Sequence, residues 1–181
     1  MFDKLVQIFI DFISLAKFWF VIEPYEAGVV TTFGKPTRDI GPTDGWFRTG
    51  FHLVLPMNVE VVEHISTQKD TTNLSGQDLV TRDGIQVRID SMFTHHIRPD
   101  KARSYVFGVG EEISFVFDRL QASVAMSVAQ VAASELNPDI FEPLVLRIAR
   151  DLLNPYGLKI HDFHVVSLVR PTRTYRLITG A

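Results

Sequence analysis

The segment Leu79 to Ile97, LVTRDGIQVRIDSMFTHHI, holds the strongest turn signal in the sequence. Asp83-Gly84 separates two runs rich in β-branched residues, and an Asp-Gly pair tolerates the positive φ angles of a tight hairpin turn. Along the second run, side chains alternate between two faces. One face carries Ile85, Val87, Ile89, Ser91, Phe93, His95 and Ile97, and the other carries Gln86, Arg88, Asp90, Met92, Thr94 and His96. The segment predicts a β-hairpin with one face in a core and the other wet or half covered.

The chain before this hairpin predicts further short strands. Residues 27–33, AGVVTTF, are rich in β-branched side chains, and Gly34-Lys35-Pro36 is expected to close them as a turn. The other expected strands are 51–55 and 59–65, followed by polar extended chain over 67–74.

The chain after the hairpin predicts helices and then one more strand. From residue 111 to 134 apolar side chains recur at helical spacing, with two glutamates at the positive N-terminal end. A short helix is expected over 99–105, another helix over 137–153 and a final strand over 158–169. Strands, then helices, then a strand predict an α+β fold with helices packed on a mostly antiparallel sheet.

The first 22 residues, MFDKLVQIFIDFISLAKFWFVI, predict a membrane-associated helix. On a helical wheel a narrow polar stripe, which includes Lys4 and Asp11, lies opposite a wide apolar face. Such a helix can lie in the bilayer interface, or span the bilayer if the stripe faces neighbouring helices, whereas a core helix is the other alternative. The side chains expected to anchor the protein are Phe2, Leu5, Val6, Ile8, Phe9, Phe12, Ile13, Phe18, Trp19 and Phe20.

A loop over residues 41–50 carries two adjacent aromatic side chains, Trp46 and Phe47. Adjacent aromatics in a loop either fill the core of their own domain or contact an interface. The pair is therefore a candidate for a second membrane or partner contact. At the other end of the chain, Arg170, Arg173 and Arg176 form a small basic patch that is either solvated or in contact with anionic lipid or a partner.

Composition excludes several classes of function. A net charge of −3 argues against binding of nucleic acid through phosphates, and the absence of cysteine removes disulfides and thiolate chemistry. Among the six histidines, His161 and His164 are expected on opposite faces of a strand, and the adjacent His95 and His96 also diverge. Because no nucleophile elbow or phosphate-binding loop is present either, we expect no catalytic residues, no metal and no cofactor.

An ordered series of short motifs resembles the SPFH or Band 7 family of stomatins, prohibitins, flotillins and the bacterial HflK and HflC proteins. The motifs are Pro24-x-Glu26-x-Gly28-Val29-Val30-x-x-Phe33-Gly34-Lys35, Gly41-Pro42, Gly50-Phe51-His52-x-x-x-Pro56, Thr81-x-Asp83-Gly84-x-x-Val87-x-Ile89-Asp90 and Pro155-Tyr156-Gly157-Leu158-Lys159-Ile160. Two departures accompany the resemblance: residues 43–49 are inserted relative to most members, and no coiled-coil heptads follow Pro171. The chain is therefore identified as a short member of the family that lacks the long C-terminal coiled coil.

The resemblance implies a membrane-anchoring helix over 1–22, an SPFH domain over 23–169 and a short tail over 170–181. It implies a non-enzymatic scaffold that forms rings or clusters of copies of itself and organises membrane microdomains. The alternative is a regulatory subunit that binds and gates a membrane protease or another ring-forming membrane partner. Membrane lipid, further copies of the chain and a membrane protein are the expected partners, and nucleic acid is not.

Overall fold

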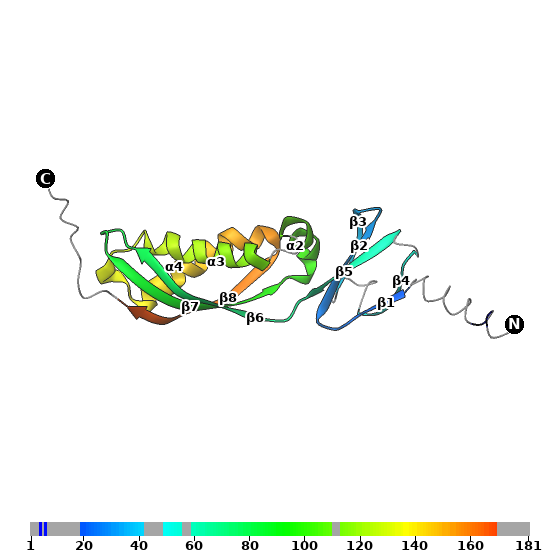
Figure 1. Ribbon diagram of the computed structural model, residues 1–181, viewed down its shortest axis with the longest axis horizontal. Coiled ribbons are helices and arrows are strands. Elements are labelled where there is room, and N and C mark those ends of the chain that lie inside the picture. Colours follow the sequence, from blue (N-terminus) through cyan, green and yellow to red (C-terminus); the bar gives the residue numbers. More distant parts are fainter. Residues whose placement is uncertain are drawn as a thin grey trace. The chain divides into compact units, whose positions relative to one another are not determined.

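The computed structural model describes Lys4, Val6 and residues 19–41, 49–55, 59–109 and 113–169 (Figure 1). The chain forms two compact units. Unit 1 comprises residues 1–68 and 97–110, and unit 2 comprises residues 69–96 and 111–181. Each unit is described by itself.

Unit 1 is built from two small antiparallel sheets. In the first, β2 (Glu26–Thr32) lies between β3 (Lys35–Ile40) and β5 (Glu60–Ser66). In the second, β1 (Trp19–Ile22) pairs with β4 (Gly50–Leu53), forming a two-stranded ribbon.

Each face of the three-stranded sheet in unit 1 has its own apolar cluster. Ile22 from the ribbon packs with Val30 and Ile40 on one face. On the other face, Ala27, Val29 and Ile65 pack with Ala102 from the short helix α2 (Ala102–Val109), which follows a 3-10 turn over Pro99–Lys101. The β1–β4 ribbon is therefore held to the sheet through its inner side chains.

Unit 2 is a three-stranded sheet with helices packed on it (Figure 1). The strand order is β6 (Asp70–Val80), β7 (Gln86–Ile97) and β8 (Leu158–Val169). The helices α3 (Ile113–Val128) and α4 (Pro138–Leu153) contact each other, and α3 also contacts β6 whereas α4 contacts β8. Phe93 lies at the centre of the core, with its ring centroid 4.6 Å from that of Phe163.

The structure confirms the α+β class, the hairpin at Asp83-Gly84 and the final strand over 158–169. The prediction for residues 35 and 36 was wrong, because Lys35 and Pro36 begin strand β3 rather than end a turn. β3 lies at a sheet edge and only its last residue, Ile40, is buried, so it has none of the alternation that marks a half-buried strand.

Two helix predictions also need correction. The helix expected over 111–134 ends at Val128, and a separate 3-10 turn covers Ala133–Glu135. Val131 and Ala133 remain buried after the helix ends, so apolar spacing continues beyond the helical backbone. The helix expected over 1–22 is wrong for its last four residues, which form β1, because tertiary pairing with β4 overrides the local pattern.

Candidate functional site: the outer face of the β1–β4 ribbon

The outer face of the β1–β4 ribbon consists of four apolar side chains that are largely in solvent. Trp19 lies opposite Leu53 and Val21 opposite Phe51. The exposed fractions are 49% for Trp19, 47% for Val21, 63% for Phe51 and 60% for Leu53. The rings of Trp19 and Phe51 stack with centroids 5.7 Å apart. We call these four side chains the ribbon face.

The inner side of the same ribbon explains why the ribbon face points outward. Ile22 is buried in unit 1, and the ring of Phe20 stacks on His52 at 5.2 Å and meets the edge of His64 at 5.9 Å. Because side chains alternate along a strand, placing Phe20 and Ile22 inside forces Trp19 and Val21 outside. If β1 shifted by one residue relative to β4, Phe20 and Ile22 would face solvent. Burial of these two side chains therefore fixes the pairing register.

An ion pair holds the end of β4 against the larger sheet. Arg38 Nη2 donates to the carbonyl oxygen of Leu53 at 2.8 Å and to Glu60 Oε2 at 3.1 Å. The same Glu60 oxygen accepts the backbone N–H of Leu55 at 2.8 Å. Leu55 is itself 54% exposed, so the apolar surface continues beyond the ribbon face. These bonds hold the backbone at Leu53 and Leu55 to side chains of β3 and β5.

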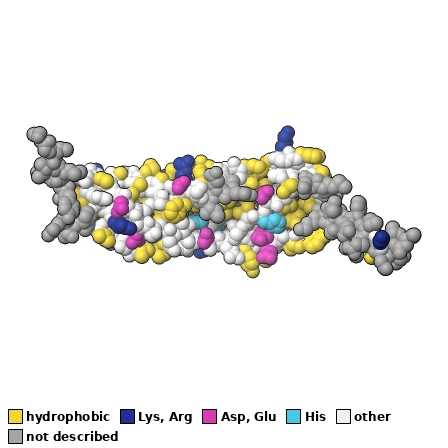
Figure 2. Space-filling view, viewed as in Figure 1, with side chains coloured by type: hydrophobic (Ala, Val, Ile, Leu, Met, Phe, Trp, Pro, Cys, Tyr) yellow, Lys and Arg dark blue, Asp and Glu magenta, His cyan; other side chains and the backbone are white. Residues whose placement is uncertain are grey.

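The ribbon face contains no ionisable side chain. Figure 2 shows hydrophobic side chains reaching the surface where Figure 1 places β1 and β4. Contiguous apolar patches on a protein surface mark sites of contact with proteins, ligands or membranes. Tryptophan suits the boundary between lipid and water, because its ring is apolar and its indole N–H can stay hydrated.

The structure places the predicted anchoring residues in two groups. Trp19 and Phe20 lie in a strand, with Trp19 facing solvent and Phe20 facing the interior, so they do not share one helical face. Lys4 and Val6 are helical and exposed. Phe2, Leu5, Ile8, Phe9, Phe12, Ile13 and Phe18 lie outside the described residues, as do Trp46 and Phe47. Within the described part of the chain, no helix has the length and apolar composition to cross a bilayer.

Several residues of the family motifs have structural roles in the described part of this chain. Pro24 lies in the turn between β1 and β2, His52 faces Phe20, and a Cβ at Gly41 would lie 3.6 Å from Cβ of Pro99. Gly34 and Gly84 adopt φ angles of 76° and 77° in hairpin turns, which favours glycine. Pro42 and Pro56 lie outside the described residues.

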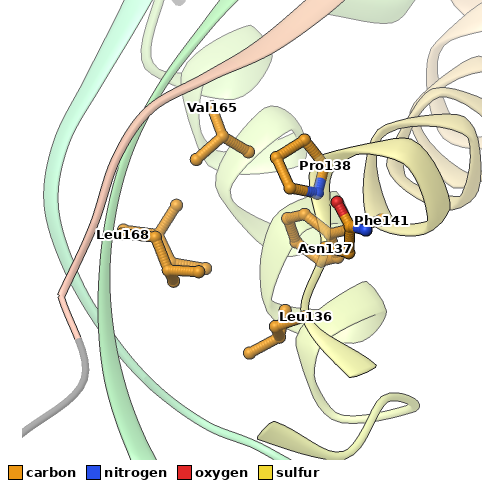
Figure 3. Close-up of a pocket in the computed structure, with 7 residues that line it drawn as sticks. Leu136, Asn137, Pro138, Phe141, Val165 and Leu168 are labelled. Atoms are coloured by element: carbon orange, nitrogen blue, oxygen red, sulfur yellow. The ribbon is translucent and has the colours of Figure 1, made fainter. Parts of the chain in front are cut away.

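Unit 2 contains an apolar pocket. It is lined by Ile89, Leu136, Asn137, Pro138, Phe141, Val165 and Leu168 (Figure 3). None of these side chains is an acid, a base or a nucleophile. The lining therefore offers apolar contact rather than chemistry.

Unit 2 contains a histidine pair that the sequence did not predict. His96 on β7 and His161 on β8 stack with centroids 4.6 Å apart, and one of the facing nitrogens, Nδ1 of His96 or Nε2 of His161, donates its proton to the other. The prediction compared histidines only within one strand, whereas this pair forms between strands. No group of three or more potential metal ligands occurs among the residues that the structure describes.

The surroundings of the histidine pair disfavour protonation. Partial burial lowers the pKa of both imidazoles, and the mutual repulsion of the pair together with Lys69 and Lys159 lowers the pKa of His96 further. The Arg150 guanidinium, which donates to the carbonyl oxygens of Ile160 and His161, adds positive charge beside His161. Burial also lowers the pKa of the neighbouring His95, although Asp70 opposes that shift.

These pKa shifts predict a loss of stability in mild acid. A histidine whose pKa is lower in the folded than in the unfolded state stabilises the fold fully above pH 6.5 and loses that contribution as the pH falls through the folded pKa. We expect the melting temperature to fall by several degrees between about pH 7.5 and pH 5.5.

Glutamine variants test the role of the histidine pair in this loss. His96→Gln and His161→Gln should each remove part of the pH dependence, and the double variant should remove little more, because the two side chains act as a pair. His164→Gln serves as the control, since His164 lies 3.7 Å from Glu142 and outside the pair. Equal pH dependence in all variants would contradict the assignment.

A comparison with models of known protein families identifies the family of this chain. The fold and the ribbon face define an α+β protein that presents an exposed apolar surface and, in its described part, no cluster of metal ligands. A profile of the SPFH domain / Band 7 family matches residues 20–178, so the chain belongs to that family. Members of the family are generally membrane-associated, non-enzymatic scaffolds. No curated protein matches the sequence.

Proposed function

We propose that this protein is a membrane-anchored, non-enzymatic scaffold whose copies join into rings or clusters that organise the surrounding bilayer. The observation that carries the proposal is the ribbon face, an ordered apolar surface directly after the apolar segment 1–18. Both would contact the same membrane, since Trp19, the first residue of the ribbon face, directly follows that segment in the chain. Trp46 and Phe47 are proposed as a further contact.

The size of the ribbon face explains why assembly matters. Moving a half-exposed apolar side chain into lipid contributes about 1 kcal/mol, so the four side chains contribute about 4 kcal/mol. That corresponds to a dissociation constant of about 1 mM, which is weak for a single copy. Joining copies raises the effective concentration of each further contact and makes attachment of the assembly strong.

Extraction from vesicles tests the membrane role of the ribbon face. The full chain carrying Phe51→Ser with Leu53→Ser should be released by alkaline carbonate to a several-fold greater extent than the unmodified chain. The matched control is Val80→Ser with Val166→Ser, which removes two apolar side chains of similar exposure, 58% and 61%, from unit 2. Release of the control to the same extent would show that general surface polarity, not the ribbon face, governs attachment.

The composition of detergent extracts separates the scaffold from the regulatory subunit. A scaffold should be recovered mainly with further copies of itself. Recovery in fixed ratio with one membrane protease or another ring-forming protein would favour the regulatory role.

A further inference from the structure

The turn between β2 and β3 places an aromatic side chain in an unfavourable position. Phe33 has a φ angle of 51°, and Gly34, the second central residue of the turn, has 76°. Phe33 is the sole non-glycine residue with positive φ in the described part of the chain, and its side chain is 80% exposed. The turn is otherwise regular, since Thr32 and Lys35 pair across it.

Phenylalanine is unfavourable at position 33 for two reasons, its backbone conformation and the exposure of its ring. Two-residue turns with positive φ at both central residues prefer Asn-Gly, and a residue with a bulky side chain in the left-handed region is strained. An exposed phenyl ring in addition gains nothing from burial within the protein. A residue that adds strain without adding packing is a candidate for a contact outside its own unit.

A chain of hydrogen bonds connects this turn to the ribbon face within unit 1. Phe33 N–H donates to the carbonyl oxygen of Val59 at 3.0 Å. The next residue, Glu60, accepts from Leu55 N–H and from Arg38, and Arg38 in turn donates to the Leu53 carbonyl oxygen. The turn therefore lies at the same end of unit 1 as Leu53 and the exposed Leu55.

We propose that Phe33 is an additional membrane contact of unit 1, which enters the interface of the bilayer that the ribbon face meets. Lys35, two residues further on and exposed, would lie among the headgroups and favour anionic lipid. One contact leaves a domain free to tilt on a membrane, whereas two contacts on different elements fix its orientation. This inference rests on the proposed membrane role of the ribbon face.

Replacement of Phe33 tests the proposal through two measurements that move in opposite directions. Phe33→Asn in the full chain should raise the melting temperature, because asparagine tolerates positive φ. The same variant should weaken binding to vesicles of phosphatidylcholine with phosphatidylserine by about threefold to tenfold in apparent dissociation constant, because the buried ring is lost. Phe33→Leu should keep both properties close to those of the unmodified chain.

The possible outcomes distinguish this inference from the proposed function. If Phe33→Asn lowers the melting temperature, or leaves vesicle binding unchanged while Phe51→Ser with Leu53→Ser weakens it, the Phe33 contact is overturned and the ribbon face stands. If neither change affects vesicle binding, the membrane role of both surfaces is overturned. If Phe33→Asn weakens binding equally for vesicles with and without phosphatidylserine, the ring contact stands and the role given to Lys35 does not.

Discussion

Replacing Asp83 by alanine should lower the melting temperature of the protein by several degrees. The Asp83 carboxylate accepts the hydroxyl proton of Thr81, and it accepts the backbone N–H of Ala133 at 3.1 and 3.3 Å to its two oxygens. Arg82 N–H beside it donates to the carbonyl oxygen of Val131 at 3.0 Å. The hairpin turn is thereby joined to the segment between α3 and α4, and alanine would leave the Ala133 N–H without its acceptor.

Asp83→Asn provides the matched variant. Asparagine has nearly the same size as aspartate and keeps one acceptor oxygen, so the Asp83→Asn protein should lose less stability than the Asp83→Ala protein. The hydrogen bond from Thr81 lowers the pKa of Asp83 below 3.8, so its contribution is present above that pH and is lost as the pH falls through the folded pKa. Thermal melts should therefore show that Asp83→Ala differs least from the unmodified chain in strong acid. If the Asp83→Ala protein had the melting temperature of the unmodified chain at neutral pH, the proposed link between the hairpin turn and the segment between α3 and α4 would be contradicted.

Adding one methyl group at Gly28 should destabilise unit 1 by about 1 to 3 kcal/mol, the usual range for overpacking. A Cβ built at Gly28 lies 2.8 Å from Cδ1 of Ile22 and 3.3 Å from Cγ1 of Val62. Ile22 is 1% exposed and belongs to the ribbon, so the methyl group would force the ribbon away from the sheet. Denaturant titration of Gly28→Ala measures the loss.

A second substitution shows whether the stability loss of Gly28→Ala comes from the close contact with Ile22 or from the backbone preference of alanine. Ile22→Val removes the Cδ1 atom that Gly28→Ala would meet, so the double variant should lose less stability than the sum of the two single variants. Additive losses would mean that the contact between Gly28 and Ile22 does not limit packing. Because the ribbon face depends on the seating of β1, Gly28→Ala should also weaken membrane binding unless Ile22→Val restores it.

The elements predicted well are those whose own residues specify them. Asp83-Gly84 forms a turn because of local backbone preference, and the strand over 158–169 follows a turn signal at Gly157, which has a φ angle of 82°. β3 was not predicted, because its residues show no alternation of apolar and polar side chains. An edge strand needs little burial and can therefore lack that pattern. The helix assigned to Trp19–Ile22 failed because an all-apolar run has no period that distinguishes helix from strand.

The sequence likewise predicts only part of the candidate site. The apolar run that contains Trp19 predicts a membrane contact, whereas the patterns around Phe33, Phe51 and Leu53 predict only strands and family motifs. Their exposure depends on pairing between β1 and β4, which are separated by β2 and β3 in the chain. No local signal identifies which face of such a ribbon will be covered.

The sequence by itself determined the α+β class, the family and the apolar character of the first segment, because turn residues, motif order and composition are local properties. Only the tertiary structure decided that Trp19–Ile22 form a strand, that Val21, Phe51 and Leu53 face outward with Trp19, and that His96 meets His161. The physical reason is that these features follow from pairing between distant segments. Such pairing is selected by the burial of Phe20 and Ile22 on the inner side and leaves the ribbon face outside.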